Sequence, residues 1–250
     1  MIDEKICNED EDIKNFIKYI KKFKSGKQGI TGLVKTNNGE MAVFKISQYL
    51  NHLCEHENII LKGLDEISNF CIHFCKGYGK YSTRLDPNFK KNDNPLKVKS
   101  KYPIKNDILL MEYIPDSFKL YNYIKNENID EKVLYSSMKQ VLMAINIAQK
   151  FKKFTHYDLH SDNIMLRKCN ENLTMLYVID ENNQYLIPTN GYIPKIIDYG
   201  FSYIEDIEDL PLWQSMAHTD VGFTSSYFDN ISDIKLLFCC TSKEISKFRQ

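Results

Sequence analysis

Hydrophobic positions return every three or four residues in three parts of the chain, the spacing that places side chains on one face of an α-helix. Residues 131–152 show it most clearly and predict a long amphipathic helix, and residues 9–24 and 48–64 predict two more. The apolar positions are Ile13, Phe16, Ile17, Ile20 and Phe23 in 9–24, Leu50, Leu53, Ile60, Leu61 and Leu64 in 48–64, and Val133, Leu134, Met138, Val141, Leu142, Ile145 and Ile147 in 131–152.

Strand signals lie mainly in the first half of the chain. Gly32–Thr36 and Glu40–Ile46 flank Asn37-Asn38-Gly39, and an Asn-Gly pair between two such runs predicts a tight hairpin. Residues 70–75 alternate in a way that predicts another strand. Residues 108–113 form a short apolar run typical of a buried strand.

These patterns predict an α+β protein with two lobes. Residues 1–114 would form an antiparallel sheet with one helix, and residues 115–250 a short, mainly helical lobe, with a hinge near 112–117. The polar stretch 84–106 carries three prolines and predicts a surface insert, and a second insert spans 168–195. The many Lys and Asn residues of 84–106 could also dock a substrate or nucleic acid, an alternative that is less favoured than a solvated insert.

Composition excludes several functional classes. Among 250 residues, 33 basic side chains balance 33 acidic ones, so no whole-molecule field favours nucleic acid or a charged membrane. No apolar run reaches the ~20 residues of a membrane span, and residues 1–12 lack a secretory pattern. Seven cysteines with no C-x-x-C pair predict free thiols, so an intracellular protein is expected.

The strongest chemical signal is the segment 156–163, which reads His-Tyr-Asp-Leu-His-Ser-Asp-Asn. Its H-x-D-L-x-x-x-N spacing is that of a catalytic loop for phosphoryl transfer, which needs a carboxylate near the incoming hydroxyl and an amide oxygen for a metal. Asp158 is the predicted base and Asn163 the predicted metal ligand. Downstream, an apolar strand ends in Asp198-Tyr199-Gly200, where the Asp198 carboxylate suits Mg²⁺.

Two further motifs precede these in the chain. Ala42-Val43-Phe44-Lys45 matches the V-A-I-K strand, whose lysine pairs with the α- and β-phosphates of ATP. Gly29 to Val34 match the last six positions of G-x-G-x-x-G-x-V, with Lys27 in place of the first glycine.

The chain resembles the eukaryotic protein kinase superfamily over residues 20–235, because a glycine loop, a strand lysine, a hinge, an H-x-D loop and a D-x-G motif follow one another in this order. The Asp-Leu-His at 158–160, the insert at 168–195 and the Ile-Ile-Asp-Tyr run at 196–199 look most like haspin and the kinase-like proteins of large DNA viruses. The resemblance implies a bilobal kinase fold, ATP and Mg²⁺, and a Ser or Thr of a protein as acceptor. For a viral chain, it would place the protein in the host cytoplasm or the virion.

The resemblance also implies roles for individual residues. Glu57, with Glu55 as a rival, would pair with Lys45, and Asp233 would brace the catalytic loop from a helix. Met111 resembles the gatekeeper, Glu112 to Ile114 the adenine-binding hinge, and Met165 the floor of the adenine site. The implied nucleotide-contacting set is Gly29, Gly32, Val34, Val43, Lys45, Met111, Glu112, Ile114, Met165 and Ile197, with Asn163 and Asp198 as metal ligands.

Departures from the family keep other functions open. Tyr157 replaces the Arg of H-R-D, which predicts activity without phosphorylation of the activation segment. His160 stands where most kinases have Lys, no A-P-E follows, and about 50 residues follow Asp198. A pseudokinase scaffold and a small-molecule kinase are therefore the alternatives. A zinc site made of His52, Cys54, His56, Cys71, His73 and Cys75 is a further alternative, less favoured than ordinary packing.

Overall fold

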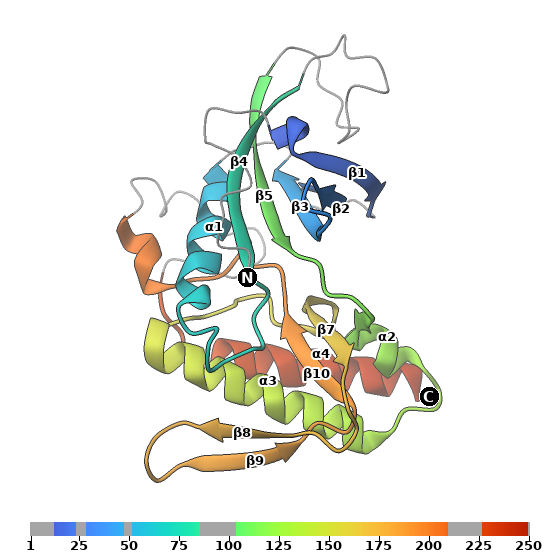
Figure 1. Cartoon of the computed structure of the whole chain (residues 1–250). Coiled ribbons are helices and arrows are strands. Elements are labelled where there is room, and N and C mark those ends of the chain that lie inside the picture. Colours follow the sequence, from blue (N-terminus) through green and yellow to red (C-terminus); the bar gives the residue numbers. More distant parts are fainter. Residues whose placement is uncertain (1–12, 24–28, 48–51, 86–103, 210–226, 250) are drawn as a thin grey trace. The chain divides into compact units, whose positions relative to one another are not determined.

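The computed structural model of the chain describes residues 13–23, 29–47, 52–85, 104–209 and 227–249 (Figure 1). The chain divides into two compact units, one made of residues 1–59 and 76–113 and the other of residues 60–75 and 114–250. Residues 60–75, assigned from the sequence to the first lobe, thus belong to the second unit.

The first unit is built on a five-stranded antiparallel sheet in the order β1-β2-β3-β5-β4. All five strands contribute to its core, which contains Ile17, Ile30, Val34, Ala42, Phe44, Tyr81, Ile108 and Leu110. The elements are the short helix η1 (Ile13–Asn15), β1 (Ile17–Lys22), β2 (Gly29–Thr36), β3 (Met41–Ser47), β4 (Gly77–Leu85) and β5 (Ile104–Glu112).

The β2–β3 hairpin and the strand that contains residues 108–112 confirm the sequence predictions. Gly39 closes the hairpin with φ +88°, and its N–H donates to the Thr36 carbonyl at 2.9 Å. The helix predicted over 9–24 is wrong within its described part, because η1 and β1 occupy it. β1 pairs with β2 along one side, so a sheet neighbour takes part of the backbone groups of residues 17–22, and Ile20 remains 43% exposed.

Helix α1 (His52–Asp65) confirms the helix predicted over 48–64, of which residues 48–51 lie outside the described part. Its first two turns belong to the first unit and its last part to the second. The strand expected at 70–75 is wrong: these residues form turns, with one parallel bridge between Phe74 and Ile196. Phe70 and Ile72 are 56% and 40% exposed, so the apolar alternation does not mark a buried strand.

The second unit is organised around α3 (Glu131–Lys152), which has the predicted bounds. The Asp130 side chain caps its start by accepting from Lys132 N at 2.8 Å, and Lys153 in the left-handed region ends it. The other elements are β6 (Ser117–Lys119), α2 (Leu120–Lys125), η2 (Ser161–Asn163), β7 (Ile164–Lys168), β8 (Thr174–Val178), β9 (Gln184–Pro188), β10 (Tyr192–Ile196), η3 (Glu205–Asp209) and α4 (Ser232–Phe248).

Two small sheets complete this unit. β10, β7 and β6 form one antiparallel sheet, while β8 and β9 form a hairpin inside the segment 168–195 (Figure 1). The described chain is therefore an α+β protein with an antiparallel sheet, as the sequence predicts. None of the helices in the described ranges has the length and apolar character needed to cross a bilayer.

Candidate functional site

The predicted site residues fall into two groups, one in each unit. In the first unit, the Lys45 ammonium lies 2.7 Å from the Glu57 carboxylate, and the two side chains are 10% and 3% exposed. Glu55, the rival partner, instead pairs with Lys80 at a more exposed position. A buried ion pair fixes both of its members, because either charge alone would be left desolvated.

Strand register decides which predicted residues share a face with Lys45. Side chains two apart on a strand, and those directly paired across strands, lie on the same face. Val43 therefore shares the Lys45 face, together with its partners Leu33 and Met111.

Val34, another residue predicted to contact the nucleotide, lies on the other face of the sheet. Val34 pairs with Ala42, and both are fully buried in the core beside Phe44, on the face opposite Lys45. The glycine pattern matched residues 29–34, but the period of two places Leu33 on the Lys45 face instead.

The remaining predicted residues of the first unit lie at strand positions. Gly29 opens β2 opposite Ser47. A Cβ on Gly32 would lie 2.5 Å from the Phe44 ring and 2.6 Å from the Lys21 carbonyl oxygen, so packing alone requires glycine there. At the end of β5, Glu112 N–H donates to Lys76 O at 2.9 Å, and its carboxylate accepts from Lys76 N at 3.2 Å.

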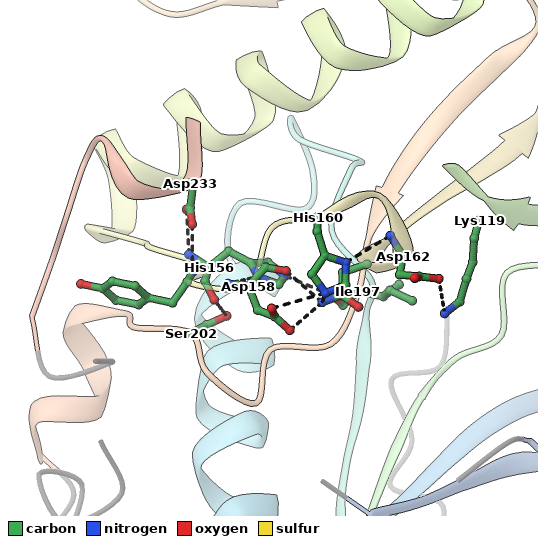
Figure 2. Close-up of polar contacts among 10 residues, drawn as sticks. Lys119, His156, Asp158, His160, Asp162, Ile197, Ser202 and Asp233 are labelled. Atoms are coloured by element: carbon green, nitrogen blue, oxygen red, sulfur yellow. Dashed lines mark hydrogen bonds and ion pairs between the residues drawn. The ribbon is translucent and has the colours of Figure 1, made fainter. Parts of the chain in front are cut away.

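In the second unit, a buried carboxylate holds the start of the 156–163 loop. Asp233, on α4, accepts hydrogen bonds from His156 N at 2.7 Å and Tyr157 N at 2.9 Å (Figure 2). The side chain is fully buried, and this burial raises the pKa of Asp233 to about 7. Tyr157 has φ +61°, a strained conformation that the two bonds help to hold.

The imidazole of His156 connects the loop to the residue before Asp198. Its Nε2 donates to Ile197 O at 3.1 Å, and its Nδ1 accepts from Asp158 N at 3.3 Å. Burial lowers the pKa of His156, so the ring is neutral, and the bond from Asp158 N fixes its proton on Nε2. Ile197 N also donates to Asn163 O at 3.0 Å, so the loop holds Ile197 from two sides.

Asp158 and Asn163 contact each other directly. Asn163 Nδ2 donates to the carbonyl oxygen of Asp158 at 2.9 Å and to its carboxylate at 3.0 Å. The amide nitrogen is thereby used, which leaves the amide oxygen as the atom suited to a cation. Asp198, with φ +66°, follows Ile197, and hard oxygen donors of this kind fit Mg²⁺.

Met165 and Ile114 complete the predicted set in this unit. Met165 lies in the middle strand β7, paired with Lys119 on β6 and with Lys195 on β10. Ile114 is buried just after the end of β5, and its carbonyl accepts from Ser117 Oγ at 2.6 Å.

Sequence reasoning gave no role to several residues that lie in this loop or contact it. His160 Nε2 lies 3.3 Å from the Asp158 carboxylate, and this bond raises the pKa of His160. Ser202 Oγ donates to His156 O at 3.2 Å, and Asp162 pairs with Lys119 at 3.1 Å (Figure 2). The H-x-D-x-H spacing was the available signal for His160, because it places a second histidine two residues after the predicted base.

The zinc alternative is not supported. Both ring nitrogens of His73 are engaged, Nδ1 with Pro194 O at 2.8 Å and Nε2 with the Tyr177 hydroxyl at 2.7 Å. In the described part of the chain, no group of three or more His, Cys, Asp or Glu side chains could hold a metal ion. The side chain of His52 and most of the 84–106 insert lie outside the described residues.

Comparison with known proteins gives viral relatives. No protein-family profile matches the chain. The chain is 33% identical to Uncharacterized protein 098R of Invertebrate iridescent virus 6, over 80% of the chain and 39% of that protein. It is 32% identical to Uncharacterized protein 038R of Invertebrate iridescent virus 3, over 78% of the chain and 36% of that protein.

A third relative carries a functional name. Over 26% of the chain and 12% of the relative, the chain is 38% identical to Probable kinase 098L of Invertebrate iridescent virus 3. The chain spans less than two fifths of the length of both uncharacterized relatives. These matches suggest a kinase relationship without assigning a substrate.

Proposed function

We propose that the chain is an ATP-dependent protein kinase that transfers the γ-phosphoryl group of ATP to a Ser or Thr hydroxyl of a protein. The observation that carries the proposal is the Asp158–Asn163 pair, hydrogen-bonded through both the backbone and the carboxylate of Asp158. The same loop forms hydrogen bonds with both the N–H and the carbonyl of Ile197, and so fixes the backbone that leads into Asp198. The short match to a protein named as a probable kinase supports it.

Each residue has a chemical role in this proposal. The Asp158 carboxylate, whose side chain is 28% exposed, accepts the proton of the substrate hydroxyl as the new P–O bond forms and the β–γ bridge of ATP breaks. ADP leaves with the charge of the broken bridge. Lys45, held by Glu57, pairs with the α- and β-phosphates.

Asn163 and Asp198 are the residues that would hold Mg²⁺, through the amide oxygen and the carboxylate. The ion would neutralise charge on the phosphates, and the positions of both side chains follow from the loop and from β10. The residues that the family resemblance assigns to the nucleotide are Val43, Met111 and Glu112 in the first unit, and Ile114, Met165 and Ile197 in the second.

The test is transfer from γ-labelled ATP with Mg²⁺ to generic protein acceptors. Asp158→Asn and Asp198→Asn should each lose at least about a hundredfold in rate, because catalysis here is positioning and charge neutralisation. Asp162→Asn is the matched control: this carboxylate belongs to the same loop but forms a half-exposed ion pair with Lys119, and the rate of the variant should stay within about twofold of the wild type.

Equal transfer by the wild-type chain and Asp158→Asn would refute the proposal. Binding of ATP without transfer by any acceptor would instead favour a pseudokinase scaffold, and transfer to a small molecule alone would favour a small-molecule kinase.

A further inference from the structure

His160 stands between the predicted base and the short helix η2. Its Nε2 lies 3.3 Å from Asp158 Oδ1, and its Nδ1 accepts a hydrogen bond from Asp162 N at 3.2 Å (Figure 2). The second of these bonds makes His160 the N-cap residue of η2. One imidazole therefore connects the carboxylate of residue 158 to the turn that contains Asn163.

The cap determines where the neutral ring carries its proton. A nitrogen that accepts from a backbone N–H must present its lone pair, so Nδ1 is unprotonated and the proton is on Nε2. That proton points at Asp158 Oδ1. Since Asn163 Nδ2 donates to Oδ2 at 3.0 Å, each carboxylate oxygen of Asp158 receives one side-chain donor.

The surroundings favour this arrangement over a freely rotating ring. His160 follows Asp158 closely, and its own N–H donates to Asp158 O at 3.0 Å, while its carbonyl accepts from Asn163 N at 2.9 Å. The neighbouring Ser161 is fully buried and donates to Glu244 on α4 at 2.6 Å. Backbone and neighbours on both sides thus restrict where the imidazole can lie.

We propose that His160 is a positioning residue for phosphoryl transfer: its Nε2–H holds the Asp158 carboxylate in the orientation that accepts the hydroxyl proton, while its Nδ1 caps η2 and contributes to stability alone. The proposal rests on the kinase function proposed above. A lysine at this position would bring a mobile charge on a flexible stem, whereas histidine supplies a directed donor and an acceptor from one rigid ring.

Two substitutions separate the two contacts. His160→Asn keeps an acceptor near the place of Nδ1 and so keeps the cap, but it is too short to reach Asp158. His160→Gln can place an amide N–H near the position of Nε2, so it keeps a donor for Asp158 and loses the cap. If His160 orients the base, the Asn variant should lose roughly tenfold in kcat with KM for ATP nearly unchanged.

The Gln variant should retain most of kcat and show a lower melting temperature than the Asn variant. A purely structural role would give the opposite order, with kcat following the melting temperature in both variants. A kcat for His160→Asn equal to that of the wild type would overturn the proposal.

Imidazole ¹⁵N chemical shifts supply a readout that needs no turnover. In the wild-type chain at pH 8, the His160 ring should show the Nε2–H tautomer, and Asp158→Ala should change the Nε2 shift. An Nδ1–H tautomer would refute the geometry of the proposal. If the wild-type chain shows the expected tautomer but transfers no phosphoryl group, the kinase function is refuted. If the wild-type chain transfers the group and the kcat of His160→Asn is unchanged, only the role of His160 is refuted.

Discussion

His73 provides a stability prediction that can be worked out from its contacts. The imidazole is almost fully buried, and it lies between Pro194 O, 2.8 Å from Nδ1, and the Tyr177 hydroxyl, 2.7 Å from Nε2. Because a carbonyl can only accept, Nδ1 carries the proton and Nε2 accepts from Tyr177. Ile196 N also donates to His73 O at 2.7 Å, so this histidine supports the strand that leads to Asp198.

Burial lowers the pKa of His73 from 6.5 to about 4. Between these values the unfolded chain binds a proton that the folded chain does not, so stability must fall as the pH falls through this window. The pKa of His73 differs by about 2.5 between the unfolded and folded chains, and each pKa unit is worth about 1.4 kcal/mol. The free energy of unfolding should therefore fall by roughly 3 kcal/mol between pH 7 and pH 4. Asp233, with a pKa raised to about 7, contributes with the opposite sign, because its contribution is lost as the pH rises.

The difference between wild type and His73→Asn isolates the histidine, since Asp233 is common to both proteins. Asn keeps a donor for Pro194 O and does not titrate. The free energy of unfolding should be measured in urea at intervals from pH 4 to pH 8. The advantage of the wild type should shrink by roughly 3 kcal/mol as the pH falls from 7 to 4, and stay constant above pH 7.

A difference that stays constant over the whole range would refute the assignment of a neutral, buried His73. The same proteins test the zinc alternative. A chelator should leave the free energy of unfolding unchanged, because both ring nitrogens are occupied by protein groups.

Three further predictions concern packing and buried charge. Gly32→Ala should cost about 1–3 kcal/mol in urea unfolding, because its Cβ would lie 2.5 Å from the Phe44 ring; Phe44→Leu should restore part of the loss. Asp233→Ala should cost about 3 kcal/mol, because it leaves two buried backbone N–H groups unpaired, whereas Asp162→Ala, at a half-exposed ion pair, should cost under about 1 kcal/mol. Glu57→Gln should cost about 3 kcal/mol in the same assay, because it removes the negative charge that lies 2.7 Å from the buried Lys45 ammonium, and unchanged stability would refute the buried pair.

Local sequence signals predicted those elements in which propensity and burial agree. In α3, the apolar rhythm coincides with an Asp N-cap, and the helix has the predicted bounds. In the β2–β3 hairpin, Gly39 supplies the positive φ that the turn requires. Both features depend on residues close to one another in the chain, which is why a single sequence suffices for them.

Contacts between distant residues explain what the sequence did not predict. The spacing of Ile13, Ile17 and Ile20 fits a helix, yet residues 17–22 pair with β2 as the edge strand of the sheet. The face of Val34 depends on its register with Ala42, and a shift of one residue reverses it. The roles of Asp158, Asn163 and Asp198 follow from motif spacing. The bonds that hold the loop, however, join His156 to Ile197 and Asp233, which lie 41 and 77 residues away from it.

The positions that depart from the kinase motifs carry compensating hydrogen bonds. Tyr157, in place of Arg, donates from its hydroxyl to Tyr227 O at 2.6 Å and packs edge-on against the Tyr227 ring. Tyr199, in place of Phe, is fully buried, and its hydroxyl donates to Ile196 O at 2.6 Å. Both side chains therefore bond to backbone carbonyls of the chain itself.

These bonds bear on how the proposed activity is regulated. An Arg in the H-R-D motif can bind a phosphorylated residue, whereas the Tyr157 hydroxyl already uses its proton on Tyr227 O, a neutral contact formed without any added phosphate. Treatment with a phosphatase should therefore leave the transfer rate within about twofold, while Tyr157→Phe, which removes only the hydroxyl, should lower stability by about 1 kcal/mol. A large loss of transfer after phosphatase treatment, restored by phosphorylation within residues 200–227, would show that the segment is regulated by phosphate after all.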